Sequence, residues 1–273
     1  MLTAGTAGAG GHRDTERGRH AIDITASGLS YSLSADHVRS GLVKTTLWNQ
    51  GDQPHQAQIG KFKDGVGVAD FRATLEGGNP EAVIGLFAGF YGGPNVVAPG
   101  HSQTTWENLP PGDYLLLCFV PDRATGMPHF AMGMYAPFEV TGPARSRSVD
   151  ADQTVTAVDP FRFVIPEELY TDSVVRFQNQ SAMDVHELSL GTLHPGKTVA
   201  DVVAWANPST GGGPPPFDVM GGAGALNPGG GEEWFTLDLP PGSYIAFCLV
   251  PDDETGLPHA AMGMVQAFTV VDD

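Results

Sequence analysis

The sequence predicts an all-β protein made of two tandem antiparallel β-sandwiches, each with one short helix. Three observations lead to this prediction. The 273 residues include 36 glycines and 22 prolines, a composition that favours turn-dense β structure over helices. Short stretches alternate apolar with polar residues, which is the period of half-buried strands. A segment near the end of each half also occurs twice, with equivalent residues 130 positions apart, which indicates an internal duplication.

The strands of the first half follow a segment without apolar periodicity, residues 1–19, which we interpret as a disordered N-terminal tail. Alternation predicts strands over residues 21–25, 31–33, 41–48 and 54–59, with a turn at 49–52. The same order returns in the second half, with strands predicted over 155–158, 161–165, 173–177 and 185–190 and a turn at 179–181. The two halves therefore share one order of elements.

One helix is predicted in each half after these strands. Thr198 stands three residues before Asp201, which is the pattern of a capped helix start. Apolar residues share one face of each helix: Val68, Phe71 and Leu75 in the first half, and Val199, Val202 and Ala206 in the second. A short, polar, aperiodic stretch then marks the boundary between halves. We predict domains over residues 20–142 and 153–273, joined by a linker over 143–152.

The chain is acidic, with 31 acidic and 14 basic residues and a net charge of −17. Lysine and arginine never form a run, so nucleic acid and anionic membranes are poor partners, because both require a basic surface. No apolar run reaches the length of about 18 residues that a membrane span needs. The first residues also lack the basic and apolar regions of a secretory signal. We interpret the charge as a solvated acidic surface.

Potential metal ligands recur in both halves. They are His55, Cys118, His129 and Met134 in the first half, and His186, Cys248, His259 and Met264 in the second. One thiolate and two imidazoles with a weak axial thioether suit type 1 copper. If Cys118 and His129 flank a hairpin centred on residues 123–124, their Cβ atoms lie about 5 Å apart across it. Met132 and Met262 are alternative axial ligands, although the spacing favours Met134 and Met264.

The two cysteines of the chain occupy equivalent positions, one in each half. A disulfide between Cys118 and Cys248 would have to join the two domains. Two cysteines at equivalent positions do not form the set of disulfides that stabilises a small secreted domain, so we interpret both residues as free thiols.

The order and flanks of these residues resemble the cupredoxins, the blue-copper proteins of plastocyanin-like type. The resemblance lies in an asparagine before the first histidine (49–55 and 179–186), in Gly-x-Tyr-x3-Cys (112–118 and 242–248) and in His-x3-Gly-Met (129–134 and 259–264). It covers both halves. It implies Greek-key sandwiches, up to one copper ion per domain, a redox partner protein or a copper donor or acceptor, and a periplasmic or secreted location.

The residues and the resemblance together predict a two-domain mononuclear copper protein that transfers single electrons or carries copper. Ten residues separate Cys118 from His129, more than is usual in the family, so a metal-free binding or scaffold module with buried thiols is the alternative. A two-domain multicopper oxidase is disfavoured, because the chain has no His-x-His pair and no cysteine flanked by histidine. The sequence leaves the oligomeric state open.

Overall fold

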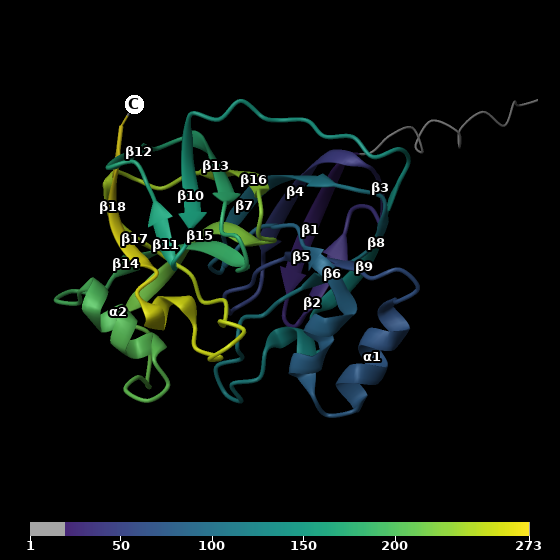
Figure 1. The fold of residues 1–273 in the computed structure, drawn as a ribbon, viewed down its shortest axis with the longest axis horizontal. Helices are drawn as coiled ribbons and strands as arrows, with labels where there is room; N and C mark the ends of the chain where they lie inside the picture. The colour runs from purple at the N-terminus through teal and green to yellow at the C-terminus, as the bar shows by residue number, and fades with distance from the viewer. Residues whose placement is uncertain (1–19, 273) are drawn as a thin grey trace, which may run out of the picture.

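Three β-sheets form the protein (Figure 1). The computed structural model describes residues 20–272, so the predicted disordered tail over 1–19 lies outside the described residues, as does Asp273. The first half contains β1 (Ala21–Ser27), β2 (Ser30–Leu33), β3 (His37–Arg39), β4 (Gly41–Asn49), β5 (Gln58–Phe62), β6 (Phe87–Phe90), β7 (Ser102–Leu109), β8 (Gly112–Leu117) and β9 (Tyr135–Thr141). The second half contains β10 (Gln153–Val158), β11 (Arg162–Val164), β12 (Glu168–Tyr170), β13 (Ser173–Asn179), β14 (His186–Leu193), β15 (Phe217–Leu226), β16 (Gly231–Leu237), β17 (Gly242–Phe247) and β18 (Val265–Val271).

The predicted fold class, two sandwiches in an all-β chain, is confirmed. A five-stranded sheet in each half faces its own part of an eight-stranded sheet, with the core between them. The alternation in β1 explains this packing, because Ile22, Ile24 and Ala26 are buried while the residues between them are more exposed. No helix among residues 20–272 is long and apolar enough to cross a membrane.

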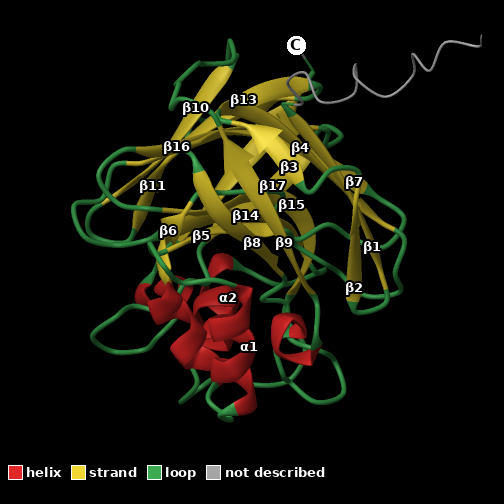
Figure 2. Cartoon of the chain, turned by 90° about the vertical axis from the view of Figure 1, so that its right-hand side faces the viewer, coloured by secondary structure: helices red, strands yellow, loops and turns green. Residues whose placement is uncertain are grey.

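The helices gather at one end of the sheets (Figure 2). They are α1 (Val68–Glu76) and α2 (Val199–Ala206), with 3₁₀ helices η1 (Pro80–Leu86), η2 (His129–Met132) and η3 (His259–Met262). The predicted cap is confirmed, since Thr198 Oγ1 accepts a hydrogen bond from the Asp201 amide at the start of α2. Phe71 on α1 packs against Phe130 of η2 with 6.2 Å between ring centroids. The helices therefore cover the segments that carry His129 and His259.

Four strand pairs among the described residues run parallel, where the sequence predicted antiparallel sandwiches. Two of them join β3 to β9 and β12 to β18. β1 is parallel to β4, and β10 is parallel to β13. Between these partners the chain crosses to the opposite sheet, through β3 in the first half and β12 in the second, and then returns in the original direction. This crossing is a long-range feature that alternation along one strand does not encode.

Main-chain pairing also joins the two halves. β7 pairs antiparallel with β16, which places Glu107 opposite Glu233 and makes one eight-stranded sheet from strands of both halves. Beneath this pair, Gln58 Nε2 donates to the carbonyl of Ala225, and the Ala225 amide donates back to Gln58 Oε1. The halves are thus parts of a continuous structure, and the division at residues 143–152 stays a prediction.

The contact between the two halves, which we call the seam, can be tested at Asn95. Its fully buried amide donates to Ser189 Oγ at 3.0 Å and to the Ala223 carbonyl at 3.1 Å. Asn95→Ala would leave these buried acceptors without a donor, so we expect a loss of about 1–3 kcal/mol in the free energy of unfolding, measured in urea. Asn79→Ala is the control, because Asn79 is exposed and makes no side-chain cap. Equal stability of the two variants would contradict this role of Asn95.

Candidate metal centres

Three of the four donors predicted from the first half come together at one point. His55 lies between β4 and β5, Cys118 follows β8 directly, and His129 begins η2. His129 Nδ1 is 3.2 Å from His55 Nδ1 and 3.4 Å from Cys118 Sγ, and His55 Nδ1 is 3.9 Å from the same sulfur. All three side chains are buried. We call this group the first centre.

The second half repeats the arrangement with His186, Cys248 and His259, which we call the second centre. His259 Nδ1 is 3.0 Å from His186 Nδ1 and 3.4 Å from Cys248 Sγ, and the third side of the triangle, from His186 Nδ1 to Cys248 Sγ, measures 3.8 Å. These three side chains are also buried. Two distant parts of the sequence thus build triangles of nearly equal size.

Each triangle has the dimensions of a metal site. In the plane of the three atoms, a point exists that is about 2.0 Å from each of them, close to ordinary metal–nitrogen bond lengths and slightly short for metal–sulfur. The same construction holds for the second centre. Each donor set therefore fits one copper ion, since thiolate and imidazole are the ligands that copper prefers in proteins.

A buried asparagine holds the segment that presents His55. Asn49 Nδ2 donates to the carbonyls of Gln53 and Val97, while its Oδ1 accepts from the Gly51 amide. His55 then pairs with Val97 in an isolated bridge, so the strand predicted over 54–59 begins only at Gln58. The asparagine that the sequence places before each histidine is thus a structural clamp for the turn.

The ten residues between Cys118 and His129 form a closed hairpin. Pro121 faces Pro128 across it, and the turn is centred about one residue later than the sequence predicted. The His129 amide donates to the Val120 carbonyl, and the Phe130 amide donates to the Cys118 carbonyl. These hydrogen bonds return His129 to the cysteine, so the long spacing does not separate the two donors.

The glycine in each His-x3-Gly-Met motif ends its 3₁₀ helix in the left-handed region, with φ of 107° at Gly133 and 99° at Gly263. This turn places the Met134 amide against the His129 carbonyl. Met134 and Met264 are fully buried in the core clusters that contain the cysteines. Met132 is 37% exposed and Met262 is 38% exposed.

Burial sets the protonation of the donors. It lowers the pKa of His55 and of His186 to about 4, with the neighbouring histidine as the next cause, and it also lowers the pKa values of His129 and His259. Burial raises the pKa of Cys118 to about 11 and that of Cys248 further. At neutral pH the imidazoles are therefore neutral and can bind a metal, while each thiol must lose its proton as the metal enters.

The sequence did not indicate a role for two side chains beside the centres, Gln56 and Glu187. Gln56 Oε1 accepts from the Phe119 amide at 3.2 Å, and Glu187 Oε1 accepts from the Leu249 amide at 3.0 Å. Each connects the residue after the first histidine with the residue after the cysteine. The signal that could have indicated these two residues is their equivalent position, directly after the first histidine of each half. The first centre has an amide at this position, and the second has a carboxyl.

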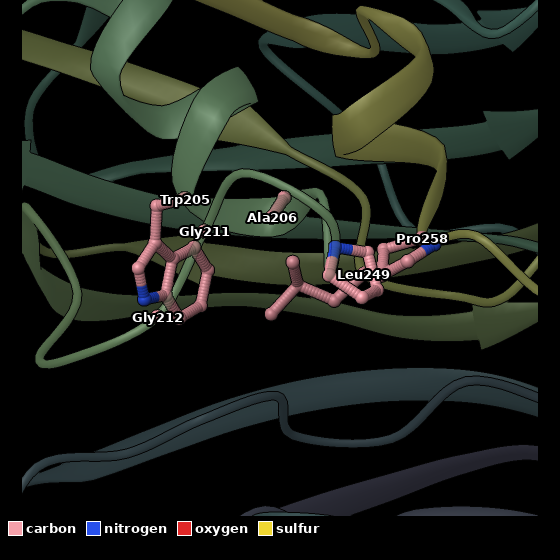
Figure 3. A pocket seen from close by; sticks show the side chains of 7 residues that line it. Trp205, Ala206, Gly211, Gly212, Leu249 and Pro258 are labelled. Carbon is pink, nitrogen blue, oxygen red and sulfur yellow. The ribbon is translucent and has the colours of Figure 1, made fainter.

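An apolar hollow lies beside the second centre (Figure 3). Leu249 and Pro258, the immediate neighbours of Cys248 and His259, line it together with Trp205 of α2. Inside the protein, the Phe161 ring lies 4.6 Å from the His259 ring. Apolar side chains thus surround this centre on several sides and keep water from it.

The fold is cupredoxin-like, with two sandwiches in one chain, and each sandwich holds one donor set of two histidines and one cysteine. No family model and no curated protein matches the chain. Among solved structures it is similar to reduced auracyanin from the photosynthetic bacterium Roseiflexus castenholzii, with 25% identity over 46% of this chain and 99% of that one, at a TM-score of 0.33.

Two further copper proteins among the solved structures are similar to this protein along most of its chain. A copper nitrite reductase from Nitrosomonas europaea shows 12% identity over 93% of this chain and 94% of that one, with a TM-score of 0.27. A multicopper oxidase shows 18% identity over 92% and 88%, with a TM-score of 0.26. All these TM-scores are below 0.5, so the similarities support no conclusion beyond the fold and the donor sets described above.

Proposed function

We propose that the protein binds one copper ion in each sandwich and transfers single electrons, with copper carriage as the related alternative. The observation that supports this most strongly is the convergence of two imidazole nitrogens and one thiol sulfur, twice, in buried triangles of metal-site size. We propose His55, Cys118, His129 and Met134 as ligands of the first centre. The corresponding ligands of the second are His186, Cys248, His259 and Met264.

The chain's own residues prepare the centres for this task. A bound copper ion would supply one-electron chemistry, because it alternates between Cu(I), which favours sulfur, and Cu(II), which imidazole tolerates. Asn49 and the hairpin hydrogen bonds fix the donors before a metal enters, so little rearrangement accompanies a change of charge. Met134 and Met264 are fully buried, whereas Met132 and Met262 are partly exposed. This difference in burial favours Met134 and Met264 as axial ligands.

Burial also favours an electron carrier over a catalyst. The donor side chains of both centres are at most 1% exposed, so no donor atom lies open to a substrate at the surface. The hollow at Trp205, Leu249 and Pro258 gives a redox partner an apolar surface close to the second centre. A net charge of −17 suits a basic partner or copper donor, and the resemblance to cupredoxins suits a location outside the cytoplasm.

The test is copper loading of the native chain. We expect two tightly held copper ions per chain and an intense visible absorption from thiolate-to-copper charge transfer, measured by metal analysis and spectroscopy. Copper that binds without visible absorption would contradict thiolate ligation. No tight binding would leave the metal-free scaffold module as the function, and more than two ions together with oxidase activity on a phenolic donor would favour the enzyme.

A further inference from the structure

The second centre has a group of additional donors on its outer side. Ligand atoms of Asp184, Asp252 and His259 lie within 4.8 Å of one another. Asp252 is buried, and Asp184 is partly exposed. Asp184 precedes His186 by two residues, and Asp252 begins the hairpin that leads to His259. The group therefore adjoins the second centre through His259.

The second ring nitrogen of His259 has no hydrogen-bond partner among the described residues. His259 Nδ1 faces Cys248 Sγ at 3.4 Å and His186 Nδ1 at 3.0 Å. Its Nε2 is buried and has no hydrogen-bond partner among residues 20–272, and the side chain is 99% buried. Nε2 of His129 in the first half also has no partner there, so what distinguishes the second half is the pair of carboxyls near the histidine. A buried imidazole nitrogen without a partner costs free energy, so a ligand for Nε2 would be stabilising.

The first half shows what the same position looks like without this group. There Gln53 takes the place of Asp184, and Asp122 takes the place of Asp252. Gln53 Nε2 donates to Asp122 Oδ2 at 3.2 Å, and the Arg123 amide donates to Gln53 Oε1 at 3.3 Å. The side chain of Asp184 has no N–H to donate, so in the second half two carboxyls stand where an amide–carboxylate hydrogen bond stands in the first.

Within residues 20–272 the two carboxyls accept hydrogen bonds from neutral groups. Asp252 Oδ1 accepts from the amide and the hydroxyl of Thr255, which lowers the pKa of Asp252 and keeps it ionised. Asp184 Oδ2 accepts from Ser181 Oγ, at 3.4 Å. No ion pair found within residues 20–272 includes either aspartate. A cation is the missing element of this arrangement.

We propose that Asp184, Asp252 and Nε2 of His259 bind a divalent transition-metal ion such as zinc, with His259 bridging this ion and the second centre. Two carboxylates and one imidazole are zinc ligands at about 2.0–2.2 Å, which places ligand atoms about 3–4 Å apart. Rotation of the partly exposed Asp184 side chain reduces the separation of the ligand atoms from within 4.8 Å to this distance. The exposure of Asp184 also gives the ion a path from solvent. The incoming ion replaces the Nε2 proton of His259, which passes to solvent.

This proposal rests on the proposed function only in assigning Nδ1 of His259 to copper. The test is native mass spectrometry of the copper-loaded chain with added Zn²⁺. We expect two copper ions and one zinc ion in the native chain. Asp184→Gln, which copies Gln53, should keep both copper ions and weaken zinc binding about tenfold or more.

A spectroscopic readout and a reciprocal variant sharpen the test. Zinc should shift the visible absorption of the second centre in Cys118→Ser, where only that centre absorbs, and should leave Cys248→Ser unchanged. Gln53→Asp should create a corresponding zinc site in the first half, since it rebuilds the pair of carboxyls beside His129.

Three results separate the possible failures. A native chain that holds two copper ions and no zinc overturns the proposal, and so does undiminished zinc binding in Asp184→Gln. If no copper loads, the proposed function has failed. Zinc then enters the empty centres, and the proposal still requires Asp184→Gln to bind one zinc ion fewer than the native chain.

Discussion

Replacing Cys118 with serine is expected to remove copper from the first centre and to reduce the visible absorption by about half, because the absorption requires a thiolate ligand. Cys248→Ser should remove the other half, and the double variant should have no such absorption. The two cysteines are in separate core clusters, so each variant acts on its own centre. Copper analysis and visible spectroscopy of the four proteins measure the effect.

The control for these variants is Met132→Leu. Met132 is partly exposed, and its Sδ accepts a hydrogen bond from Thr125 Oγ1 at 3.8 Å, away from the first centre. We expect its spectrum to match that of the native protein. An unchanged spectrum in the double cysteine variant would show that sulfur is not a copper ligand in either centre.

Raising the pH is expected to destabilise the metal-free protein through two carboxyls at the seam. Glu107 and Glu233 face each other across β7 and β16, and both are fully buried. Burial raises the pKa of Glu107 to about 8 and also raises that of Glu233, where the charge of Glu107 adds to the effect. Both carboxyls cannot ionise so close together without a large cost, so the pair keeps a proton at neutral pH.

The two carboxyls differ in their hydrogen bonds. Both oxygens of Glu233 accept backbone amides, from Gly93 at 2.8 Å and from Gly224 at 3.1 Å, which suits a carboxylate. Glu107 Oε2 accepts from Thr45 Oγ1, while its Oε1 has no partner within the described residues. Glu107 is protonated at neutral pH, and its ionisation as the pH rises towards about 8 introduces a negative charge into the seam.

The sign of the pH effect follows from the raised pKa. A carboxyl with a folded-state pKa above its unfolded value stabilises the fold fully below the unfolded pKa, here about 4.5, and loses that contribution as the pH rises towards about 8. We expect the free energy of unfolding to fall by an amount on the order of 3 kcal/mol across this window. Glu107→Gln should remove most of this fall, because an amide does not ionise.

Urea unfolding of the metal-free chain between pH 5 and pH 9 tests this prediction. Glu76→Gln is the matched control, since Glu76 is exposed at the end of α1 and should retain the native pH profile. A Glu107→Gln profile parallel to that of the native protein would mean that the seam carboxyls do not control the pH dependence.

The sequence singled out the histidines and cysteines that the structure brings together, because they belong to short motifs that occur twice. His129 and Cys118 lie only eleven positions apart, so one hairpin is enough to bring them together. The fold class followed in the same way from alternation within single strands, since burial in a two-layer sheet has the same period.

The parts that the sequence did not predict depend on contacts between distant segments. Glu107 and Glu233 occupy inward positions of their strands, yet a glutamate is expected at the surface, so its burial could not be inferred without the partner strand. The pairing of β7 with β16 joins residues more than a hundred positions apart, and no local pattern marks it. The pairing of Asp184 with Asp252 was hidden for the same reason.

The strand pairing between β7 and β16 also bears on how the protein avoids misassembly. A half separated from its neighbour would present β7 or β16 as a bare edge, with its amides and carbonyls open to any other extended chain. Within the intact protein each of these edges is permanently occupied by the other. The tandem arrangement thus acts as a built-in safeguard against aggregation, in addition to positioning two sites for metal.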